Sequence, residues 1–177
     1  MRYLIVILFL SQSLFAQQFL TKTGEVSFFS SATLEDIQAE NNNLGGVLDI
    51  NSGEYAFKIA IQDFIFPNSL MQEHFNESYL ESDKFPYATF QGKIENFSAT
   101  DLQSKSEIVC KGKFTIHGVT KNVELKSVLQ KKEDSIEIES VFFILLKDYD
   151  IKIPKIVFYN IAEEIRVNVS ASLKQLK

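Results

Sequence analysis

Residues 71–94 read MQEHFNESYLESDKFPYATFQGKI, and they combine a short helical pattern with a strand-like pattern. Apolar side chains recur at helical spacing in the first half, where Phe75 and Tyr79 are in i,i+4 register. Pro86 prevents the helix from continuing, because proline lacks a backbone N–H and disfavours helical geometry in the residue before it. We therefore predict a helix over residues 68–82 and a strand after the proline. A lid, a plug or the wall of a binding site would each have this pattern.

The rest of the chain is dominated by strand patterns. Apolar and polar residues alternate over successive segments, which is typical of strands with one buried face. The predicted strands cover residues 25–29, 44–50, 55–66, 88–97, 106–117, 121–131, 135–147 and 161–173. A shift of the apolar phase after Asp63 indicates a bulge or bend near that residue. Segment 32–43 is a second candidate helix, or else an irregular crossover.

Eight antiparallel strands with one buried face form either a sandwich or a closed barrel. A barrel leaves no exposed sheet edge, and at eight strands its interior either fills with side chains or holds one small ligand. No linker, repeat or low-complexity tract divides the segments, so we expect one domain. The pattern alone leaves sandwich and barrel open.

The first 16 residues have the pattern of a secretory signal peptide. Arg2 provides a positive start, residues 3–10 are apolar, and residues 11–16 are more polar and end on the small residue Ala16. The apolar run has about half of the ~20 residues that a bilayer span requires, which disfavours a membrane anchor. We therefore expect cleavage after Ala16 and an exported domain over residues 17–177.

Charge and cysteine content exclude several classes of protein. The chain carries 18 basic and 23 acidic residues, a net charge of −5, which argues against a nucleic-acid partner. Cys110 is the single cysteine of the sequence, so an internal disulfide is impossible. Its position on the inward phase of the strand at 106–117 predicts a buried structural thiol.

The residues that could carry catalysis or bind a metal form no recognisable motif. His74 and His117 lie on different predicted elements without a ligand-spaced partner, so we interpret them as hydrogen-bonding or surface histidines. Serines are plentiful, but none lies in a Gly-x-Ser-x-Gly turn. We expect no metal and no cofactor. An enzyme that acts on a lipid or quinone, with either histidine as base, is the weakest of three functional hypotheses.

The apolar residues indicate a function more strongly than the histidines and serines do. The apolar side chains of the inward phases and of the helix would converge on one interior, where they either fill a dry core or line a pocket. A pocket of this composition favours a long apolar ligand over a sugar or nucleotide. The candidate ligand-binding residues are Phe57, Ile59, Phe64, Phe66, Leu70, Met71, Phe75, Phe90, Phe114, Phe142 and Ile144.

Three segments, taken in chain order, resemble the YceI-like family of exported lipocalin-type proteins. They are HFNESYLES at 74–82, KFPYATFQGKI at 84–94 and GKFTIHGVTKNVEL at 112–125. The resemblance implies an all-β fold: an extended, eight-stranded antiparallel lipocalin-like barrel with one or two short helices. It also implies a hydrophobic pore that holds a long polyisoprenoid or similar amphiphilic lipid, a periplasmic or secreted location, and a possible homodimer.

On this resemblance we expect a non-enzymatic binding protein whose pocket is lined by the eleven apolar residues named above. The alternative is a barrel with a filled core that has a structural or interaction role and takes up no ligand.

Overall fold

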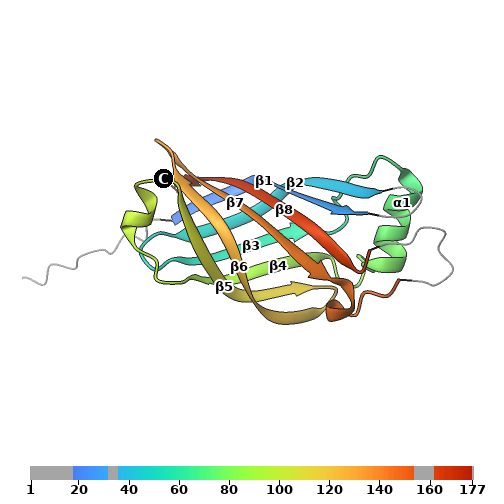
Figure 1. Ribbon diagram of the computed structural model, residues 1–177. Helices are drawn as coiled ribbons and strands as arrows, with labels where there is room; N and C mark the ends of the chain where they lie inside the picture. The colour runs from blue at the N-terminus through green and yellow to red at the C-terminus, as the bar shows by residue number, and fades with distance from the viewer. Residues whose placement is uncertain (1–17, 32–35, 154–161, 177) are drawn as a thin grey trace, which may run out of the picture.

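The structure is a computed structural model that describes residues 18–31, 36–153 and 162–176. The predicted signal peptide at residues 1–16 lies outside the described residues. Within them, eight strands pair antiparallel in sequence order, and β8 pairs back with β1 to close a barrel (Figure 1). The strands are β1 Gln18–Ser30, β2 Ile37–Asp49, β3 Glu54–Ala60, β4 Tyr87–Ile94, β5 Ser106–Ile116, β6 Val119–Lys131, β7 Ser135–Leu145 and β8 Glu164–Gln175. The prediction of an all-β, eight-stranded barrel is confirmed, and the sandwich is excluded.

Tight turns join neighbouring strands where the sequence supplies suitable residues. His117 and Gly118 link β5 to β6 with φ values of 51° and 74°, and the flanking residues Ile116 and Val119 are paired. Two central residues with positive φ define a turn whose twist matches that of a hairpin. Gly53 provides the same freedom between β2 and β3, with φ 74°.

The predicted helix is present but shorter than the predicted range of residues 68–82. α1 Ser69–His74 continues into a π-helical turn, η1 Phe75–Tyr79, and the N–H of Leu80 donates to the carbonyl of Phe75 at 2.9 Å. Asn68 caps the helix, because its side-chain oxygen accepts hydrogen bonds from two backbone N–H groups of the first turn. Two short 3-10 helices, η2 Ala99–Leu102 and η3 Leu146–Tyr149, complete the helical elements of the described residues.

The second candidate helix at 32–43 is wrong over its described part. Residues 37–43 belong to β2, which pairs with β1 from Ile37 opposite Ser30 to Asn41 opposite Val26. Ala39 and Asn41 are buried and their neighbours are exposed, so the segment does alternate. The alternation is hidden in the sequence because a polar residue, Asn41, occupies a fully buried position (0% exposed).

Asn41 also accounts for the early end of β3, which the sequence extended to residue 66. Its side-chain N–H donates to the carbonyl of Ala60 at 2.9 Å, and its side-chain oxygen accepts from the N–H of Asn43 at 2.9 Å. The chain leaves the barrel wall after Ala60 and turns over residues 61–63, which confirms the predicted bend near Asp63. It then returns to bridge Glu40 through Ile65.

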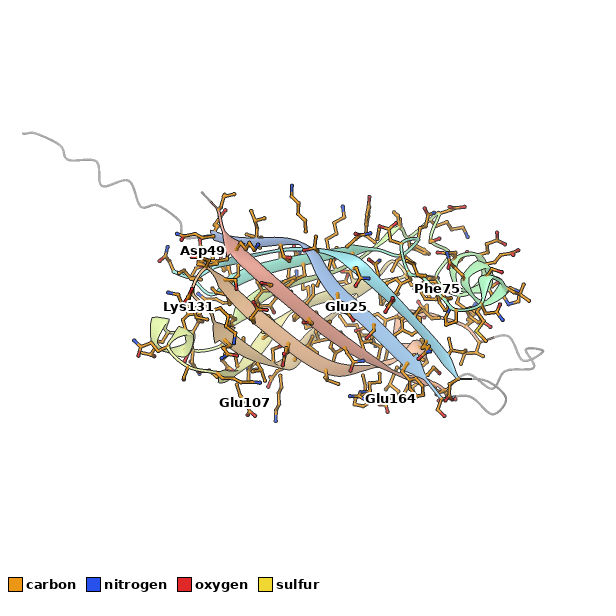
Figure 2. The ribbon with its side chains drawn as sticks, turned by 90° about the horizontal axis from the view of Figure 1, so that it is seen from above. Glu25, Asp49, Phe75, Glu107, Lys131 and Glu164 are labelled. Atoms are coloured by element: carbon orange, nitrogen blue, oxygen red, sulfur yellow. The ribbon has the colours of Figure 1, made fainter. Side chains whose placement is uncertain are left out.

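The most completely buried side chains gather mainly at one end of the barrel, which we call the filled end. Five aliphatic side chains from five strands are almost completely buried there: Leu48, Ile94, Leu129, Ile136 and Leu173. Figure 2 shows Asp49 and Lys131, which lie close to two of them in sequence, at the end of the barrel opposite Phe75. Figure 1 shows α1 at that other end. The candidate functional site is therefore the part of the barrel interior that lies beside α1.

Candidate functional site

An interior cavity of about 240 Å³ lies between the filled end and the helical segment 69–79. Its lining is mainly aliphatic and aromatic, and is supplied by all eight strands and by α1. Leu70 on α1 lines the cavity and is 55% exposed, so the cavity reaches the surface beside this helix. For comparison, an engineered apolar cavity of about 150 Å³ binds benzene, and pockets for drug-sized ligands span roughly 300–1,000 Å³.

All eleven candidate ligand-binding residues line this cavity, and their contact with a ligand stays a prediction. They come from β3, the segment after β3, α1, η1, β4, β5 and β7. In chain order they are Phe57, Ile59, Phe64, Phe66, Leu70, Met71, Phe75, Phe90, Phe114, Phe142 and Ile144.

Phe75 is the centre of an aromatic cluster at the helical end of the cavity. Its ring centroid lies 5.5 Å from that of Phe28, 5.7 Å from Phe64 and 5.0 Å from Phe66. Phe28 was not among the candidate residues, although it shares the phase of Val26 in the strand predicted there; the adjacent Phe29 obscures the alternation. The cluster joins β1, the segment after β3 and the helix, so it forms the wall of the cavity at this end.

A second row of rings continues along the barrel interior. Phe114 on β5 lies 6.5 Å from Phe90, 6.0 Å from Phe142 and 5.5 Å from Tyr149, in edge-to-face arrangements. Edge-to-face pairs of this kind stabilise a core beyond the area that they bury. Phe114 is itself 9% exposed, so it belongs to the structural core as well as to the cavity wall.

Three buried polar side chains of the lining lie toward the filled end. Tyr55, Cys110 and Ser127 are all buried and all line the cavity. Burial raises the pKa of the Tyr55 hydroxyl, and the neighbouring Cys110 adds to the shift. Burial also raises the pKa of the Cys110 thiol, which the Ser127 hydroxyl partly offsets. The groups are therefore neutral at ordinary pH. The prediction of a buried Cys110 is confirmed, and the polar role of Tyr55 was missed.

His117 holds three elements together beside the cavity. Its Nδ1 lies 3.0 Å from the carbonyl oxygen of Tyr149, and its Nε2 lies 3.2 Å from a carboxylate oxygen of Glu81. Its ring packs edge-to-face on Phe85 at 4.7 Å. Glu81 pairs with Lys84 as well, and hydrogen bonds from Lys84 and then His117 lower the pKa of its carboxyl. The interpretation of His117 as a hydrogen-bonding residue is confirmed.

His74 is exposed on α1 and borders the cavity. Within residues 18–31, 36–153 and 162–176, no group of three or more His, Cys, Asp or Glu side chains is arranged to hold a metal ion. Among the same residues, none of the helices combines the length and apolar character needed to cross a bilayer. The chemistry that this site offers is mainly apolar contact, with buried neutral hydrogen-bonding groups toward the filled end and exposed polar side chains, among them Lys58 and His74, at its border.

The fold and the cavity define a closed antiparallel barrel with an apolar interior site. The chain belongs to the YceI-like family, because the model of the YceI-like domain matches residues 16–173. The resemblance noted in the three sequence segments is thereby confirmed.

Solved structures share this fold at low sequence identity. A polyisoprenoid binding domain from Saccharophagus degradans, implicated in plant cell wall breakdown, has a TM-score of 0.77 and 15% identity over 91% of this chain and 99% of that chain. BcnA from Burkholderia cenocepacia has a TM-score of 0.69 and 14% identity over 85% of this chain and 95% of that chain. The YceI protein of Campylobacter jejuni has a TM-score of 0.57 and 16% identity over 99% of this chain and 92% of that chain. No curated protein matches this chain in sequence.

Proposed function

We propose that this protein is an exported, non-enzymatic binding protein that holds a long apolar, polyisoprenoid-like lipid in its barrel. The observation that carries the proposal is the apolar cavity that begins at the filled end and reaches the surface beside α1. Such a cavity suits a ligand that enters lengthwise and leaves one end near the surface. The naming of the Saccharophagus degradans domain as polyisoprenoid binding supports the same class of ligand.

Binding would come mainly from the removal of methylene and methyl groups from water. Each buried CH₂ contributes about 0.8 kcal/mol, against the entropy lost when a flexible chain is straightened. Methionine adapts to irregular shapes because its side chain is unbranched and polarisable. Met71 on α1 borders the cavity close to the exposed Leu70, where the wall must adjust to chains of different length.

A barrel with a structural or interaction role is the second candidate, and one observation favours it. The cavity of about 240 Å³ lies below the roughly 300–1,000 Å³ of most small-molecule pockets. On this reading the aromatic cluster around Phe75 is a plug, and no lipid is taken up. The lipid-binding proposal requires instead that the helical segment moves outward when a long chain enters.

Native mass spectrometry of the full chain, purified from its own organism without detergent, tests the proposal. We expect a homogeneous added mass that can be extracted into organic solvent and that changes the thermal melting of the protein when it is removed. A clean unliganded mass, together with no uptake of a fluorescent lipid, would contradict lipid binding and favour the filled barrel. N-terminal sequencing of the same material tests export, which predicts a chain that begins at Gln17.

A further inference from the structure

Tyr55 buries a hydroxyl group that has no hydrogen-bond partner among the described residues. The side chain is 5% exposed, and its hydroxyl oxygen is out of contact with solvent. Tyr55 lines the cavity near the filled end, since it is the second residue of β3 and pairs with the fully buried Leu48. A buried hydroxyl without a partner is costly, because it has lost its hydrogen bonds to water and gained none in return.

The neighbouring strands β4 and β5 leave space for the Tyr55 side chain. Tyr55 on β3 pairs with Gly92 on β4, which pairs with Gly112 on β5. The two glycines leave the inner surface bare, so the tyrosine side chain can lie across them, as aromatic side chains often do over glycine in sheets. A Cβ added at Gly112 would lie 2.9 Å from the Tyr55 hydroxyl oxygen. The rings of Phe57 and Phe90, at 6.1 and 5.0 Å, support the Tyr55 ring.

The surroundings of the hydroxyl are polar but carry no charge. The Cys110 thiol is near enough to add to the raised pKa of Tyr55, and the Ser127 hydroxyl in turn interacts with Cys110. The basic side chains that border the cavity, Lys58 and His74, are exposed. An anionic group at this depth would lack a compensating cation, and a buried unpaired charge is strongly disfavoured. A neutral oxygen at this depth could instead accept a hydrogen bond from the Tyr55 hydroxyl.

We propose that Tyr55 is a specificity-determining residue that donates a hydrogen bond to a neutral oxygen, a hydroxyl or a carbonyl, carried by the apolar ligand at its inner end. This inference rests on the proposed function and deepens it. The ligand enters with its neutral oxygen first, and its hydrocarbon chain extends past the Phe114 row toward α1. An isoprenoid alcohol, aldehyde or ketone is preferred to the matching hydrocarbon and to the matching diphosphate.

The test compares the full chain with its Tyr55→Phe variant, which removes only the hydroxyl oxygen. Affinities for farnesol, farnesal, farnesene and farnesyl diphosphate are measured by competition against the fluorescent probe N-phenyl-naphthylamine. We expect Tyr55→Phe to weaken binding of farnesol and farnesal by about three- to tenfold, the range for one hydrogen bond, and to leave farnesene unchanged. The unaltered protein should bind farnesol more tightly than farnesyl diphosphate.

Tyr79→Phe is the matched control, because Tyr79 also lines the cavity but lies on the helical segment. It should leave the ratio of farnesol to farnesene affinity unchanged. Tyr55→Phe should melt at the same temperature as the parent protein or higher, since it removes a hydroxyl that nothing in the described structure satisfies.

Three results would overturn the inference. Equal losses for farnesol and farnesene would assign Tyr55 a packing role, and unchanged farnesol affinity would show that its hydroxyl is not used. A lower melting temperature for Tyr55→Phe would show that the hydroxyl has a partner within the protein. In each of these cases lipid binding itself stands. If the unaltered protein binds none of the four compounds, the inference and the proposed function both fail.

Discussion

At the scale of single residues, Glu81 and His117 show how a few side chains fix the helical segment to the barrel. Glu81 follows the π-helical turn, whereas His117 lies in the turn between β5 and β6. Both adopt positive φ, at 43° and 51°, which is uncommon for residues other than glycine. His117 faces two acceptors, the Tyr149 carbonyl and the Glu81 carboxylate. The protonated ring can donate to both, whereas the neutral ring can donate to only one.

The Glu81 contacts predict a pH-dependent contribution to stability. Because Lys84 and His117 lower the pKa of the Glu81 carboxyl in the folded protein, its contribution is present above the ordinary value of 4.5 and is lost as the pH falls through the lowered pKa. We expect Glu81→Gln to reduce the free energy of unfolding at neutral pH and to have a progressively smaller effect below the ordinary glutamate pKa. Urea denaturation across the acid range measures this difference.

Glu77→Gln provides the control, since Glu77 lies on the exposed side of η1. It should show no such trend. A Glu81→Gln effect that stays constant with pH would mean that the residue acts through packing rather than through its charge.

At the scale of elements, the helical segment 69–79 decides whether the barrel is a container or a filled core. No residue of α1 or η1 is fully buried, and its apolar side borders the cavity through Leu70, Met71 and Phe75. Short π-helical turns inside helices often mark functional sites. Because the segment contributes no fully buried residue, its outward movement should cost less than displacing a barrel strand, although the ring contacts of Phe75 would have to rearrange.

Two alanine substitutions, Phe75→Ala and Phe114→Ala, distinguish a helical segment that lines a pocket from one that plugs a filled core. Phe114→Ala removes a core ring that contacts three other rings and should cost about 3–5 kcal/mol of unfolding free energy. Phe75→Ala should cost less, because Phe75 is only partly buried, and it should weaken lipid binding. Thermal melts with and without lipid compare the two variants. Phe75→Ala would instead identify a plug if it unfolds the protein as severely as Phe114→Ala and leaves lipid affinity unchanged.

At the scale of the whole molecule, the filled end of the barrel lies opposite the end that carries the helical segment 69–79. The end near Asp49 and Lys131 holds the five almost fully buried aliphatic residues, and the end near Phe75 holds the cavity (Figure 2). Closed strand pairing links the two ends without a free edge. Under the proposed function, the filled end maintains the fold while the other end opens to a ligand.

This division predicts an uneven pattern of amide hydrogen exchange. Amides of β5 and β6, which pair continuously from Ser106 opposite Leu129 to Ile116 opposite Val119, should exchange most slowly. Amides of residues 69–79 should exchange faster, since that segment opens locally without unfolding the barrel. Farnesol should slow exchange in residues 69–79 more than in any strand, because this segment borders the proposed entrance. Uniform exchange rates, or protection by farnesol at the filled end alone, would contradict entry beside α1.

Much of the fold could be predicted from the sequence because alternation is a local property. The strands predicted at 88–97, 106–117 and 121–131 agree within a few residues with β4, β5 and β6, since apolar residues recur in one phase along most of each segment. The prediction failed at 32–43, where the buried Asn41 is satisfied by Ala60 and Asn43. The sequence around Asn41 does not indicate that this polar side chain will be buried, because its partner Ala60 is far away in the chain.

The candidate site divides in the same way. Local patterns were enough to predict the strands, the helix that ends before Pro86, and the apolar residues that face the interior, because each depends on neighbours in the chain. The return of β8 to β1 that closes the barrel, and the cavity between the filled end and α1, could be learned only from the three-dimensional structure. It also brought Tyr55 over two glycines from two other strands. These outcomes depend on register and on distances across the barrel, which are set only when residues far apart in the chain pair with one another.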